Sequence, residues 1–146
     1  MALHNEYKRK MLASQGLAYR ALLLKASFVP DVDTQMNRSD IAAFEVSAPG
    51  YTAGGVALTG EAIVKNDGSD NSVLSAGAAE WTNIDLTGDP AGYIAIVVDS
   101  GAANTDTIAL TDTTRDPDNP ANAKVFNGNY ATLRFPAPAG GIVVIQ

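Results

Sequence analysis

The chain has 146 residues, of which 46% are apolar and 18% are charged, and its formal net charge is −6. This length fits one domain, and the apolar content excludes a disordered chain, which combines few apolar groups with high charge. The sequence has no cysteine and one histidine, His4, which excludes disulfide scaffolds, thiolate metal sites and cysteine nucleophiles.

The first segment with a regular pattern is residues 3–15, which is predicted to form a short helix. Leu3, Tyr7 and Met11 recur at helical spacing and would form one apolar stripe. Gly16 is suited to ending that helix. We therefore expect a basic N-terminal helix or arm over residues 1–16, followed by a separate folded domain.

Charge is unevenly distributed along the chain. Residues 1–25 carry five basic side chains and one acidic one, whereas residues 26–146 carry five basic and fifteen acidic ones. Lys8, Arg9 and Lys10 are therefore either a solvated helix face or part of an arm that docks on an acidic neighbour, such as another copy of the chain. We expect no nucleic-acid partner, because the net negative charge repels phosphate.

From residue 17 onward the sequence predicts strands. The segments are rich in Val, Ile, Thr, Leu and aromatic residues, and Gly, Pro, Asn or Asp bound them. Residues 66–71 carry strong turn chemistry and predict a hairpin between the strands on either side. The segments are 17–29, 43–47, 54–66, 72–75, 80–86, 92–100, 106–112, 129–135 and 140–146.

The spacing of these strands indicates the fold class. No helices of about a dozen residues lie between them, as parallel α/β folds require. We predict a mainly β chain, in which residues 17–146 form one antiparallel domain resembling a β-sandwich or jelly roll, with a small barrel as the alternative.

Two long connections, residues 28–41 and 112–122, are candidate contact surfaces, because long loops in compact domains are often functional. The second loop holds Asp112, Asp116 and Asp118, and carboxylates of this kind can bind calcium. Asp67 and Asp70 offer a second grouping. Neither has the spacing of an EF-hand, and solvated turn carboxylates are the simpler interpretation.

The sequence contains little catalytic chemistry. The glycine-rich residues 50–56 lead into a strand pattern, with neither the Gly-Lys-Ser/Thr ending nor the helix of a phosphate-binding loop. There is no Gly-x-Ser-x-Gly elbow, and His4 would have to serve any triad. Trp81 is expected to fill the core rather than to stack on a sugar. We therefore predict no enzyme, no catalytic residues, no metal and no cofactor.

The order of these segments is similar to a family of small virion structural proteins of tailed bacteriophages. The most distinctive part is Glu-Val-Ser at residues 45–47 followed by Gly-Tyr-Thr-Ala-Gly-Gly at residues 50–55. Ala48-Pro49 stands where the family usually has Gly-Thr. The resemblance covers most of the chain, and it implies a β-rich virion component with no catalytic residues to carry over.

From this resemblance we expect a capsid decoration (cement) protein that binds the major capsid protein lattice and other copies of itself, as a dimer or trimer. A tail or neck (head–tail connector) protein of the same kind of virion is the alternative, and a carbohydrate- or receptor-binding β-sandwich module is the second. We expect a chain made in the host bacterial cytoplasm and located in the virion, with no signal peptide, no membrane span and no small-molecule substrate.

The expected partner contacts lie in three places. The first is the basic arm, the second is the 28–41 connection, and the third is the apolar C-terminal strand, which must pair either within its own sheet or with a neighbouring molecule. The candidate contact residues are Tyr7, Lys8, Arg9, Lys10, Pro30, Asp31, Asp33, Ile142 and Val144.

Overall fold

The computed structural model describes residues 18–60, 62–66, 71–101, 103–119, 121–135 and 143–145. Its strands are β1 (Tyr19–Lys25), β2 (Val56–Ala57), β3 (Ala62–Asn66), β4 (Asn71–Ser75), β5 (Ala79–Asp85), β6 (Ala91–Val98), β7 (Ile108–Thr113), β8 (Asn129–Phe135) and β9 (Val143–Ile145). Among these residues the helices are one short α-helix, α2 (Arg38–Ile41), and the 3-10 turns η1 (Ala42–Phe44) and η2 (Ala103–Thr105).

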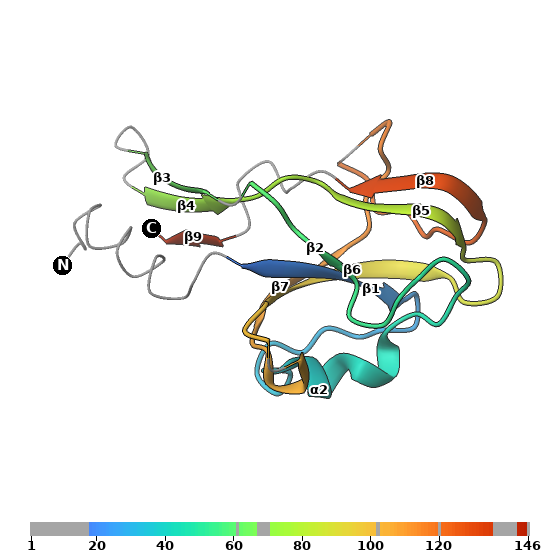
Figure 1. Ribbon diagram of the computed structural model, residues 1–146, viewed down its shortest axis with the longest axis horizontal. Coiled ribbons are helices and arrows are strands. Elements are labelled where there is room, and N and C mark those ends of the chain that lie inside the picture. The colour runs from blue at the N-terminus through green and yellow to red at the C-terminus, as the bar shows by residue number, and fades with distance from the viewer. Residues whose placement is uncertain are drawn as a thin grey trace.

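The described strands form three hydrogen-bonded groups, and every described pairing is antiparallel. A four-stranded sheet has the order β2-β1-β6-β7, a three-stranded sheet has the order β3-β4-β9, and β5 pairs with β8. The prediction of a mainly antiparallel β chain is therefore confirmed. Figure 1 shows β5 and β8 on one side of the four-stranded sheet and α2 on the other.

Strand β1 is covered on both faces. Tyr19, Ala21 and Leu23 belong to one core cluster, which also contains residues of β5 and β8. Leu22 and Leu24 belong to a second cluster, on the α2 side of the sheet. A strand that is buried on both faces needs apolar residues at consecutive positions, which explains the unbroken run at the centre of β1.

The segment that follows β1 forms the layer beneath the sheet. Phe28 is 2% exposed, and its ring makes edge-to-face contacts with Phe44 at 5.4 Å and with Tyr93 at 5.3 Å between centroids. Ile41 is fully buried in the same cluster. These anchors hold the chain from β1 to η1 against the sheet.

Three strand predictions need correction. Residues 43–47 form no strand: they contain the last two residues of η1 and then an extended stretch, because Ile41 and Phe44, three positions apart, both face the cluster around Phe28. Their one ladder contact is the isolated bridge between Glu45 and Leu24. The helix α2, at the end of the predicted 28–41 connection, was not predicted.

The other two corrections concern strand length. The predicted strand 17–29 ends at Lys25, where the chain turns and the Phe28 amide donates to the Lys25 carbonyl. The predicted strand 54–66 is two strands, β2 and β3, because Gly60 adopts a φ of 68° between them and interrupts the extended run.

The remaining strand predictions are confirmed, with ends that differ by one or two residues at most places. Strands β3 and β4 pair from Ala62 with Ser75 to Asn66 with Asn71, which is the predicted hairpin; the turn between them lies outside the described residues. Strand β9 pairs with β4 of its own chain, Val144 opposite Val73. The predicted helix 3–15 also lies outside the described residues.

Candidate interaction surface

The connection from Phe28 to Asn37, called the 28–37 loop below, is held by its own hydrogen bonds. The Asp31 carboxylate accepts from the backbone amides of Asp33 at 3.0 Å and Thr34 at 3.3 Å, and from the Thr34 hydroxyl at 2.7 Å. The side chain of Gln35 donates to the Val29 carbonyl and accepts from the Asp31 amide. The loop is therefore a fixed turn structure.

Both ends of the 28–37 loop are attached to the body of the protein. At its start Phe28 is buried in the core. At its end the Ile108 amide donates to the Met36 carbonyl at 3.0 Å, and Asn37 forms a bridge with Thr107 next to β7. A loop with a buried anchor and a sheet contact keeps its shape without a partner, so little ordering entropy opposes binding to it.

The 28–37 loop exposes large apolar side chains. Val29 is 72% exposed, Val32 is 85% exposed and Met36 is 62% exposed. Apart from Val125, these are the exposed large apolar residues of the described chain. Apolar side chains that are grouped on a preformed surface indicate a contact site, because their exposure to water is unfavourable.

The same surface is acidic. Asp31, Asp33 and Asp40 are all exposed, and the cation of this region, Arg38, is turned inward with its Nη2 3.3 Å from a carboxylate oxygen of Glu45. Hydrogen bonds lower the pKa of the Asp31 carboxyl, from the Thr34 side chain first and then from the Asp33 amide. The Asn37 and Met36 amides lower the pKa of Asp40 in the same way. The Asp31 and Asp40 carboxylates are therefore ionised at neutral pH.

The structure thus places three of the predicted contact residues, Pro30, Asp31 and Asp33, together in one exposed loop. Tyr7, Lys8, Arg9, Lys10 and Ile142 lie outside the described residues, as does the side chain of Val144.

Sequence reasoning missed the apolar members of the surface, Val29, Val32 and Met36. The local sequence does not distinguish them, since an apolar residue among Pro, Asp and Gln can face either the core or the solvent.

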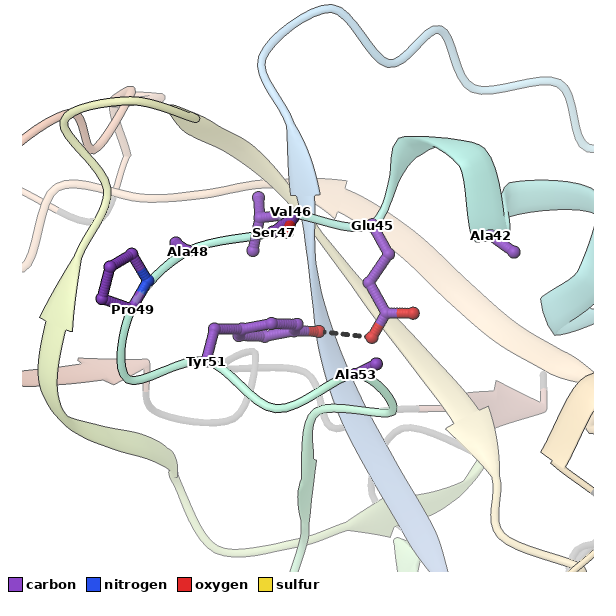
Figure 2. Close-up of a pocket in the computed structure, with 8 residues that line it drawn as sticks. All are labelled: Ala42, Glu45, Val46, Ser47, Ala48, Pro49, Tyr51 and Ala53. Carbon is purple, nitrogen blue, oxygen red and sulfur yellow. Dashed lines mark hydrogen bonds between the residues drawn. The ribbon is translucent and has the colours of Figure 1, made fainter.

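A second candidate is an open cavity of about 400 Å³ beside η1. Figure 2 shows the lining residues, with the side chain of Glu45 directed at the Tyr51 hydroxyl. That hydroxyl donates to Glu45 Oε1 at 2.7 Å and accepts from the Leu23 amide at 3.3 Å. The Gly54 amide donates to the same Glu45 oxygen at 2.5 Å, and Oε2 faces Arg38. Both oxygens of Glu45 are therefore engaged within the chain.

The contacts of Gly54 and Gly55 with β1 explain the glycine-rich motif. Arg20 donates from Nε and Nη2 to the carbonyls of Gly54 and Gly55, each at 2.8 Å. Gly55 has a φ of 63°, and a Cβ there would overlap the Ala21 carbonyl of β1. The motif is thus a turn packed against β1, and its contacts are structural.

The acidic loop after β7 is also internally paired. Asp112 accepts from the Arg115 guanidinium at 2.9 Å, and Asp116 lies 3.5 Å from the Lys124 ammonium. Asp116 also accepts from the Asp118 amide. Among the described residues, no group of three acidic or histidine side chains is placed to hold a metal ion. Asp67 and Asp70, the second predicted grouping, lie outside the described residues.

Trp81 lies in the core, 4% exposed, as the sequence predicts. Its ring stacks on Tyr51 at 6.2 Å and meets Phe135 edge to face at 6.1 Å.

Comparisons with family models, curated proteins and solved structures give no match for this chain. The similarity to phage virion proteins accordingly stays a prediction. In the part of the chain that the structure describes, no helix is long and apolar enough to cross a membrane.

Proposed function

We propose that this chain is a structural protein of a tailed-phage virion that acts as a capsid decoration (cement) protein. Its partners in this proposal are the major capsid protein lattice and other copies of itself. The observation that carries the proposal is the braced 28–37 loop, which presents Val29, Val32 and Met36 to solvent. A protein that binds a lattice needs such a preformed contact surface.

We also propose that the strands of the domain form a β-sandwich. Its support is the core cluster that joins residues of β1 and β6 to residues of β5 and β8, so that two layers of strands share one apolar interior.

The outer face of the β5–β8 pair is polar, with Glu80 and Arg134 3.9 Å apart and both well exposed. The 28–37 loop, with its exposed apolar side chains, is therefore a better contact surface than the outer face of this pair.

The effect on the shell would arise by mass action. A protein that binds the assembled lattice and has no affinity for free subunits shifts the equilibrium toward the assembled state. Heads loaded with the protein should therefore release their DNA at a higher temperature than heads without it.

The test is a binding measurement on phage heads that lack this protein, with Val32→Ser as the variant and Val125→Ser as the matched control. Both valines are exposed, at 85% and 51%, so neither change should unfold the chain. We expect the wild-type chain and Val125→Ser to bind at hundreds of copies per head, and Val32→Ser to bind about tenfold more weakly, the effect of burying one valine. Absence of binding to heads would overturn the proposal.

The copy number separates the proposed role from its alternative. Hundreds of copies on the shell support a decoration protein. A dozen or fewer, found at the neck or tail of a reconstructed virion, would make the chain a connector or tail protein.

A further inference from the structure

The acidic and apolar surface of the 28–37 loop restricts what can cover it. Two copies that met loop to loop would bring Asp31, Asp33 and Asp40 of one molecule against the same carboxylates of the other. Like charges brought into contact in this way repel each other. The occupant must therefore combine apolar side chains with positive charge.

The chain has ten cations. Six of them form ion pairs within the described structure: Arg20 with Asp99, Lys25 with Asp89, Arg38 with Glu45, Arg115 with Asp112, Lys124 with Asp116, and Arg134 with Glu80. A seventh, Lys65, has a side chain outside the described part. The remaining three are adjacent in sequence, at Lys8, Arg9 and Lys10.

The sequence around these three cations has the required apolar component. Leu3, Tyr7 and Met11 recur at helical spacing, so a helix over this segment would carry an apolar stripe next to its basic residues. Positive charge and an apolar stripe together are the complement of the 28–37 loop.

We propose that the 28–37 loop of one molecule is the docking site for the N-terminal segment, residues 1–17, of a second copy. The contact joins two different surfaces, so it is heterologous and closes into a ring, such as a trimer, or continues along a lattice. We assign the segment to a second copy because other copies of the chain are partners in the proposed function, and docking within one chain is the outcome that the cross-linking test below would report instead. The inference rests on the proposed function and deepens it: it assigns the 28–37 loop to the contact between neighbouring copies on the lattice, and loss of that contact also weakens binding to heads.

Zero-length cross-linking tests the contact directly. Full-length protein, half of it labelled with ¹⁵N, is treated with a carbodiimide, which joins lysine amines to carboxylates. We expect cross-linked peptides between Lys8 or Lys10 and Asp31 or Asp33 in which one partner is labelled and the other is not. Cross-links of a single isotope form would place the docking within one chain, and no cross-link between these segments would show that there is no docking; either result overturns the proposal.

Charge reversal tests the contact by complementation. Asp33 is chosen because the described hydrogen bonds of the loop use the carboxylate of Asp31 instead. Asp33→Lys and Lys10→Glu should each weaken self-association about tenfold in sedimentation experiments, as expected for a reversed contact charge, and 0.5 M salt should weaken the wild-type association. A mixture of the two variants should recover association, because the reversed arm of one fits the reversed loop of the other.

Asp118→Lys is the matched control, since Asp118 is exposed in a different loop. It should associate as the wild type does. An association that is equal in all variants, or a mixture that recovers nothing, would contradict the proposed contact. These measurements need no phage heads, so a failure to bind heads and a failure to self-associate are separate results.

Discussion

The hydroxyl of Tyr51 and the guanidinium of Arg38 meet the two oxygens of one carboxylate, that of Glu45, at 2.7 Å and 3.3 Å. Only 8% of the Glu45 side chain and 15% of the Arg38 side chain are exposed. This carboxylate therefore joins α2, η1 and the glycine-rich turn, and its removal leaves a largely buried cation without its partner.

Glu45→Ala should lower the free energy of unfolding by about 3 kcal/mol, because breaking a buried pair leaves an uncompensated charge. The control is Glu80→Ala, whose partner Arg134 lies 3.9 Å away on an exposed face. That change should cost no more than about 0.5 kcal/mol. Urea unfolding measures both changes. Equal losses in the free energy of unfolding would show that the Glu45 network contributes no more stability than an exposed ion pair.

Tyr51→Phe should change how stability depends on alkaline pH. Burial, with the Glu45 carboxylate beside it, raises the pKa of the Tyr51 hydroxyl far above its ordinary value of 10. Above pH 10 the unfolded chain releases this proton while the folded chain keeps it, so stability falls as pH rises.

At pH 7 we expect Tyr51→Phe to be less stable than the wild type by about 1 kcal/mol, the value of a lost hydrogen bond. The difference should shrink as the pH rises from 9 to 11. Urea midpoints across this range measure it, and a difference that stays constant would contradict the raised pKa.

Gly55→Ala should be strongly destabilising, because Gly55 has a φ of 63° and an added Cβ would overlap the backbone of β1 at Ala21. Gly60 is the matched control, with a φ of 68° and nothing within 4 Å of the added atom. Gly60→Ala should cost about 1–2 kcal/mol for the left-handed conformation alone. Thermal unfolding should show a larger loss for Gly55→Ala, and similar losses would mean that the turn does not press against β1.

Asp31→Asn should reduce stability at neutral pH and not at low pH. The folded pKa of Asp31 is lowered, so its contribution is present above the unfolded pKa, near 3.8, and is lost as pH falls through the lower folded value. The melting temperature of the wild type should exceed that of Asp31→Asn at pH 6, and the two should converge near pH 2. Asp33→Asn is the comparison variant at pH 6, where it should melt at the wild-type temperature, because none of the hydrogen bonds described for the loop uses the Asp33 carboxylate.

The strands were largely predictable because their patterns are local. Strand β8 has the predicted bounds, residues 129–135, because Asn127 and Gly128 precede this segment in the sequence and Pro136 follows it. The continuous apolar run of β1 indicated a buried strand. The layer beneath the sheet was not predictable in the same way: α2 is a single turn, and its position depends on Ile41 and Phe44 meeting Phe28 from outside the segment.

The candidate surface was predicted in location and not in composition. Pro30, Asp31 and Asp33 are in the exposed loop, but the carboxylate of Asp31 is turned to the amides of its own loop. The apolar Val32 and Met36 escaped notice, because an apolar residue in a short sequence window gives no sign of whether it faces the core or the solvent. That distinction depends on where Phe28 anchors the loop.

The burial of β1 on both faces has a consequence for synthesis of the chain. Its principal partner, β6, is made about seventy residues later, so the apolar strand leaves the ribosome well before the strand that will cover its edge, and nonlocal pairing of this kind slows folding. In that interval Leu22, Leu23 and Leu24 are available to other nascent chains or to chaperones. Expression at low temperature, or with extra chaperone, should therefore raise the soluble yield.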